Sequence, residues 1–76
     1  MRLKTLFEAR CCRIRFVTSR GLAVNSPAVG SIEQAQQWIA HMCNPNATGI
    51  RLSFFDEEEG CEVIICRFNC EGEIVK

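Results

Sequence analysis

The chain has 76 residues, of which 47% are hydrophobic, and nine Lys and Arg residues balance nine Asp and Glu residues. This length allows one domain, residues 1–76, with one modest core. The composition is too apolar, and the net charge too low, for intrinsic disorder. No apolar stretch approaches the roughly 20 residues that a membrane span needs, so we expect no membrane partner.

Residues 1–10 fit two patterns. Leu3, Leu6 and Phe7 suit one face of a helix, whereas alternate residues from Leu3 to Ala9 suit one face of a strand. We interpret the segment as a strand. It has charges throughout and no uninterrupted apolar region, unlike a signal peptide. We therefore expect a cytoplasmic protein, whose reducing compartment keeps the six cysteines as free thiols.

A hairpin is expected next. Cys12, Ile14 and Phe16 alternate with Arg13, Arg15 and Val17, which is the period of a half-buried strand. Ser19-Arg20-Gly21 predicts a turn, because glycine adopts a positive φ without steric cost. Leu22 to Val24 then form a short return strand, which ends at Asn25-Ser26-Pro27.

A helix is predicted over about residues 31–43. Ser31 can cap its first turn, and Gln34 completes a capping box. Asn44-Pro45 ends it, because proline cannot continue a helix. The apolar stripe at helical spacing comprises Ile32, Ala35, Ile39 and Met42, with Trp38 at its edge.

Two further strands follow the helix. Ile50, Leu52 and Phe54 alternate with more polar positions, and the acidic run from Asp56 to Gly60 predicts a solvated turn. The second strand would put Ile64, Cys66 and Phe68 on one face and Val63 and Ile65 on the other. Residues 73–76 could add a last short strand. We therefore predict an α+β fold in ββαββ order, a four-stranded antiparallel sheet with one helix packed on one face.

One short helix can cover only one face of such a sheet. The opposite face would carry arginines beside apolar residues, a composition that is enriched in interface cores. Three covers are possible: residues 1–10, a second copy of the chain, or a foreign partner. Alternatively, the apolar patch is small and needs no cover. A register slip of one residue would exchange the two faces. The residues predicted on this face are Arg13, Arg15, Val17, Arg51, Phe55, Val63, Ile65 and Arg67.

Charge is unevenly distributed along the chain. Residues 1–20 include six basic residues and one acidic residue, whereas residues 51–76 include seven acidic and three basic residues. Basic and acidic strands could lie side by side and neutralise each other. Alternatively, the charges could form two separate patches that attract a charged partner.

Catalytic and metal chemistry find little support in the sequence. The cysteines lack the short CxxC spacing of common zinc sites, and His41 diverges from Cys43 on a helix. No paired carboxylates in an apolar setting, phosphate loop or nucleophile elbow is present. We expect no enzyme activity, no catalytic residue, no metal and no cofactor.

The hairpin, followed by the segment from Val29 to Ile39, VGSIEQAQQWI, resembles small phage-encoded anti-CRISPR proteins. These are compact α+β inhibitors with a helix on an antiparallel sheet. The same residues are similar to arm-type DNA-binding domains of integrases, which normally end with their helix, whereas this chain continues with two strands. The first resemblance implies a binder that blocks a larger complex without chemistry, and it assigns no particular functional residue.

We therefore expect a non-enzymatic protein-binding module that acts as a stoichiometric inhibitor of a larger complex. The alternatives are a nucleic-acid-binding domain that uses a basic sheet face and a self-associating structural protein, which would form a homodimer. The expected partner-binding residues are Arg13, Arg15, Arg51, Phe55, Ile65 and Arg67.

Overall fold

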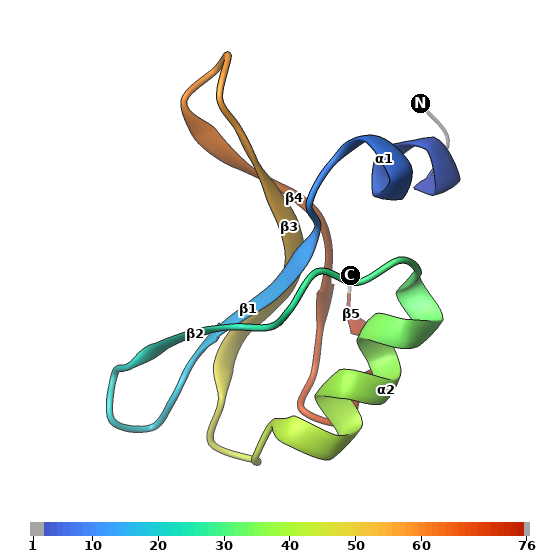
Figure 1. The fold of residues 1–76 in the computed structure, drawn as a ribbon. Helices are drawn as coiled ribbons and strands as arrows, with labels where there is room; N and C mark the ends of the chain where they lie inside the picture. The colour runs from blue at the N-terminus through green and yellow to red at the C-terminus, as the bar shows by residue number, and fades with distance from the viewer. Residues whose placement is uncertain (1–2, 76) are drawn as a thin grey trace.

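The computed structural model of the chain describes residues 3–75. It is an α+β fold in which five antiparallel strands form one sheet in the order β2-β1-β3-β4-β5 (Figure 1). The expected ββαββ core is confirmed, and the short segment before residue 76 adds a fifth strand. The elements are α1 (Leu3–Ala9), β1 (Arg13–Val17), β2 (Ala23–Asn25), α2 (Ile32–Met42), β3 (Thr48–Asp56), β4 (Cys61–Phe68) and β5 (Ile74–Val75).

The predicted strand over residues 1–10 is wrong, because Leu3–Ala9 form helix α1. Residues 1 and 2 of that prediction lie outside the described residues. Leu6 and Phe7 both pack against the core. Adjacent residues of a strand point to opposite faces, whereas adjacent residues of a helix can share one side, so only the helix buries both. Helix α1 lies on the same side of the sheet as α2 (Figure 1). Within residues 3–75, no helix is long and apolar enough to cross a bilayer.

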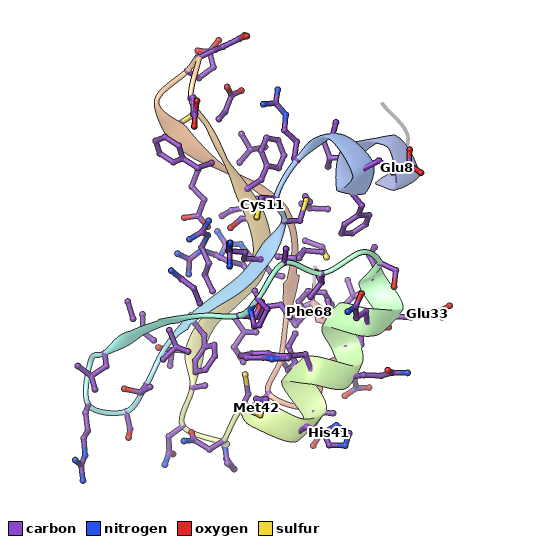
Figure 2. The ribbon with its side chains drawn as sticks, in the orientation of Figure 1. Glu8, Cys11, Glu33, His41, Met42 and Phe68 are labelled. Carbon is purple, nitrogen blue, oxygen red and sulfur yellow. The ribbon has the colours of Figure 1, made fainter. Side chains whose placement is uncertain are left out.

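Helix α2 begins as predicted. The Ser31 Oγ accepts a hydrogen bond from the Gln34 N–H at 3.0 Å. In a standard capping box the Gln34 side chain would accept from the N–H of Ser31. Here its Oε1 accepts instead from the N–H of the preceding residue, Gly30, at 2.8 Å. The buried stripe ends at Ile39. Met42 was expected on that stripe but is 62% exposed, since it lies at the end of the helix (Figure 2).

The core lies between the sheet and the two helices. Phe68, near the end of β4, lies between the sheet and α2 (Figure 2). The Phe16 and Trp38 rings pack with their centroids 6.0 Å apart. The Arg10 guanidinium lies over the Phe54 ring, 5.4 Å from its centroid, where the side chain shields the edge of the core. The buried hydrophobic residues are Cys12, Ile14, Phe16, Val29, Ala35, Ile39, Ile50, Leu52, Phe54 and Phe68.

A β-bulge in β4 changes which side chains face the core. Leu52 pairs with Cys66, but the next residue of β3, Ser53, pairs with Ile64, so Ile65 is an extra residue. Val63 and Ile65 therefore pack against the core, while Ile64 is 38% exposed on the opposite face. The predicted faces of these three residues are wrong, because strict alternation does not continue through a bulge. Cys66 and Phe68, beyond the bulge, do pack with the core as predicted.

Candidate functional site

One face of the sheet is turned away from both helices, and we call it the open face. No helix or strand within residues 3–75 covers it, and side-chain nitrogen atoms gather on this side of the sheet (Figure 2). The uncovered second face expected from the sequence is therefore present, and residues 3–10 do not cover it. The strand registers place on this face Arg13, Arg15, Val17, Ala23, Asn25, Arg51, Ser53, Phe55, Glu62, Ile64, Arg67 and Val75.

Three arginines lie directly opposite one another across the open face. Arg15 of β1 pairs with Arg51 of β3, and Arg51 pairs with Arg67 of β4. We call these three residues the arginine row. Like charges directly opposite each other in a sheet are destabilising. The first interpretation of the charge distribution, neutralisation between basic and acidic strands, holds for this row only in part, through Glu62 of β4.

The acidic residues lie mostly elsewhere. The runs 56–59 and 71–73 stand at the two ends of β4, in or beside turns. Glu62 is the acidic side chain that the described strands place on the open face. Four arginines thus share the open face with one glutamate, so this face carries a net positive charge although the whole chain is neutral.

Glu62 binds the centre of the arginine row. Its Oε2 accepts from Arg51 Nε at 2.7 Å, and its Oε1 accepts from Arg51 Nη2 at 3.1 Å. Arg15 Nε lies 3.9 Å from the same Oε2. The Arg51 hydrogen bonds are the largest cause of a lowered Glu62 pKa; partial burial opposes them, and a Ser53 hydrogen bond and the two arginine charges add to the lowering. Glu62 is therefore a carboxylate at neutral pH.

Further hydrogen bonds hold the guanidinium groups of Arg13 and Arg15 in place. Arg15 Nε donates to Ser53 Oγ at 3.0 Å, and Arg13 Nη1 donates to the Ser26 carbonyl at 3.0 Å. The Arg67 side chain makes no hydrogen bond or ion pair within residues 3–75. Because a guanidinium has five N–H donors, each of these arginines still has donors for a ligand. Held side chains also lose less entropy when a ligand binds.

An apolar centre lies beside the arginine row. Phe55 is 55% exposed and Ile64 is 38% exposed. They are diagonal neighbours across β3 and β4, since Ile64 pairs with Ser53 and Phe55 pairs with Glu62. A shallow hollow adjoins them and is lined by Arg15, Ala23, Asn25, Arg51, Phe55 and Glu62.

Most of the expected partner-binding residues therefore share one surface. Strand pairing brings Arg13, Arg15, Arg51, Phe55 and Arg67 to the open face. Ile65 does not join them, because it is the bulge residue and packs against the core. Sequence reasoning missed Ile64, whose placement no alternation pattern revealed. It also missed Glu62, although a hairpin centred on the acidic turn would have placed that residue opposite Phe55.

Other chemically active side chains lie away from this surface. His41 Nδ1 lies 2.9 Å from the Gln37 carbonyl at the end of α2. All six cysteines are free thiols, and burial is the main cause of raised pKa values for Cys12, Cys43 and Cys66. No group of three or more His, Cys, Asp or Glu side chains among residues 3–75 is placed to hold a metal ion.

Comparison of the chain with protein-family models, curated proteins and solved structures gives no match. The open face is a cationic surface with an apolar centre.

Proposed function

We propose that the chain is a non-enzymatic protein-binding module whose open face docks on an acidic surface of a partner protein. In this proposal it acts as a stoichiometric inhibitor, because occupying that surface excludes whatever else the partner binds there. The observation that carries the proposal is the arginine row on an uncovered sheet face.

The electrostatics of the row support an anionic partner. Two like charges about 4 Å apart repel by about 1 kcal/mol in bulk water and by more near a protein surface. Glu62 offsets only part of this repulsion, because its one carboxylate contacts two of the three guanidinium groups, those of Arg51 and Arg15. Carboxylates supplied by a partner would complete the neutralisation, in planar pairs that suit the guanidinium geometry.

The apolar centre supports a protein partner in particular. Arginine and aromatic residues are enriched in protein interfaces, and binding energy concentrates where such residues meet in a central patch. Phe55 lies next to the arginine row, with more than half of its surface exposed. Burying such a ring would add a hydrophobic contribution that is independent of salt.

The acidic runs favour a protein over a nucleic acid. They lie at both ends of β4, so an extended polyanion following the strands past the open face would meet carboxylates at each end. A compact acidic patch on a protein would not extend that far. Single-stranded nucleic acids also need several stacking rings, and Phe55 is the one aromatic residue that the described strands place on this face.

The proposal is tested by comparing two double variants. Arg15→Ala with Phe55→Ala removes one arginine and the exposed ring from the open face. Arg20→Ala with Leu22→Ala is the matched control, because both residues are exposed beyond β1, away from the open face. Each variant and the wild type would be used to capture proteins from the native cells, with quantitative mass spectrometry and melting curves as readouts.

We expect one protein to be enriched by the wild type and the control, and reduced about tenfold or more with the open-face variant. Melting curves check that both variants are folded; the open-face variant should melt lower by at most about 4–8 °C, because it loses the Arg15 hydrogen bond to buried Ser53. Equal capture by all three proteins would refute the proposed surface. A gel shift with duplex and single-stranded DNA tests the alternative: binding that falls steeply with salt and disappears in the open-face variant would favour nucleic acid instead.

A further inference from the structure

The open face and the acidic turn beyond it are complementary in charge. We propose that a second copy of the chain covers the open face while no partner is bound, in an antiparallel face-to-face dimer. This inference rests on the proposed function, since it assigns a second occupant to the same docking surface. The dimer would then be the resting form, and the partner would have to displace one copy.

Three features lie in sequence along the β3–β4 hairpin. The arginine row crosses its base at Arg51 and Arg67, and the turn at its far end carries the exposed residues Glu57–Glu59. This hairpin projects beyond the rest of the sheet (Figure 1). Glu57 lies six residues after Arg51, a separation of about 20 Å in an extended strand. Phe55 and Ile64 lie between the two charged ends.

Symmetry then selects one arrangement of two open faces. A two-fold axis parallel to the strands would place each acidic turn over the other acidic turn and each arginine row over its equivalent, which is repulsive. A two-fold axis across the strands reverses the strand direction of the second sheet. Each acidic turn, Glu57–Glu59, then lies over the arginine row of the other copy.

The same arrangement brings the apolar residues together. The midpoint between Arg51 and Glu57 falls at Phe54, next to Phe55 on the open face. The axis across the strands therefore passes close to Phe55 and Ile64, which would pack near their equivalents in the second copy. Arg13 of β1 and Glu62 of β4 lie level with this apolar pair, one on each side of it. The result is an apolar pair flanked by one charge of each sign, with acidic turns meeting arginines at both ends of the interface.

The size of the open face determines how tightly two copies are expected to bind. Five strands span about 20 Å across, and the eight residues of β4 span about 27 Å along the sheet. The interface would thus be at or below the lower end of the range for stable complexes, of about 1,200 Å² in total. We expect a dimer that dissociates at micromolar concentrations and weakens as salt screens the charged pairs.

The test is sedimentation equilibrium on three proteins at low salt. The turn variant carries Glu57→Gln, Glu58→Gln and Glu59→Gln, which leaves the arginines, Phe55 and Ile64 unchanged. Asp56 is retained, because its Oδ1 accepts hydrogen bonds from the N–H groups of the turn. The matched control removes three exposed carboxylates elsewhere on the surface: Glu8→Gln, Glu33→Gln and Glu71→Gln.

We expect the wild type and the control to dimerise, and the dissociation constant of the turn variant to rise about tenfold or more. A wild type that stays monomeric up to about 0.5 mM would overturn the inference. So would a turn variant that dimerises as well as the control. Neither result would affect the proposed function, because the turn variant keeps an intact open face and should still capture the partner.

The orientation has its own test. In an Arg67→Lys variant, a carbodiimide can join the new amine to a carboxylate in direct contact with it. Mass spectrometry should then find an intermolecular cross-link from position 67 to the turn Glu57–Glu59, and this cross-link should vanish at high salt. Cross-links from position 67 to Glu33 or Glu8 instead would exclude the antiparallel arrangement.

Discussion

Replacing Glu62 by glutamine tests whether this carboxylate holds the arginine row together. The substitution keeps the shape of the side chain and removes the charge. Exposed ion pairs contribute about 0.2–1 kcal/mol, and charge-assisted bonds with two short contacts are the stronger ones. The Glu62 side chain is 30% exposed and receives bonds of 2.7 and 3.1 Å from Arg51. We therefore expect Glu62→Gln to cost about 1 kcal/mol, at the upper end of this range.

A loss of this size lowers the melting temperature of so small a domain by about 4–8 °C. Thermal unfolding followed by circular dichroism at pH 7 and low salt would measure it. A double-mutant cycle with Arg51→Met isolates the coupling between the two side chains. The difference in melting temperature between the wild type and Glu62→Gln should shrink in about 1 M salt, where charges are screened within about 3 Å. A Glu62→Gln variant as stable as the wild type would refute the role assigned to Glu62.

The pH dependence provides a second readout of the same contact. The folded-state pKa of Glu62 is lowered, first by the Arg51 hydrogen bonds, so the folded protein holds this carboxyl ionised more strongly than the unfolded chain does. The stabilisation is fully present above the unfolded pKa of about 4.3 and is lost as pH falls through the lower folded pKa. The gap in melting temperature between wild type and Glu62→Gln should therefore narrow below about pH 4.

Two further predictions concern a tight turn and the thiols. Gly72 has φ +88°, and a Cβ there would lie 2.7 Å from the Gln36 carbonyl oxygen, whereas Gly60 has φ +68° and nothing within 4 Å. Gly60→Ala should lower the free energy of unfolding by about 1 kcal/mol through backbone strain alone. Gly72→Ala should lower it by clearly more, because the new methyl group also meets the Gln36 carbonyl oxygen. Equal losses for the two variants in urea unfolding would contradict this contact. Iodoacetamide should label exposed Cys61 rapidly while buried Cys12, whose pKa is raised mainly by burial, reacts only after unfolding, and equal labelling rates would contradict this packing.

The sequence predicts the sheet and the main helix well, because their patterns are local. Ser31 and Asn44-Pro45 bracket α2 to within one or two residues of its observed ends. The alternation around Ile14 and Leu52 assigns β1 and β3 to the correct faces, and those two residues pair with each other. The open face was thus predictable in outline. Its prediction needs only the side on which alternate residues of β1 and β3 lie, and the fact that one main helix covers one face of a sheet.

Two features escape prediction because they depend on contacts between distant segments. The spacing of apolar residues in 3–9 suits a strand and a helix equally well. The helix is favoured because it lets both Leu6 and Phe7 pack against the core. The bulge at Ile65 has no local marker such as glycine, because every residue around it suits a strand. Its position follows from pairing with β3, and so the placement of Ile64 on the open face could not be inferred from β4 alone.

The bulge also gives this hairpin some tolerance to changes in length. Ile65 is the one residue of β4 without a counterpart between the Leu52–Cys66 and Ser53–Ile64 pairs. A homologous chain lacking this residue could keep every other pair in place, with Val63 inside and Ile64 outside as before. Deletion of one residue from a strand ordinarily moves every side chain beyond it to the opposite face of the sheet. Deletion of Ile65 would instead convert the irregular β3–β4 hydrogen-bond ladder into a regular one.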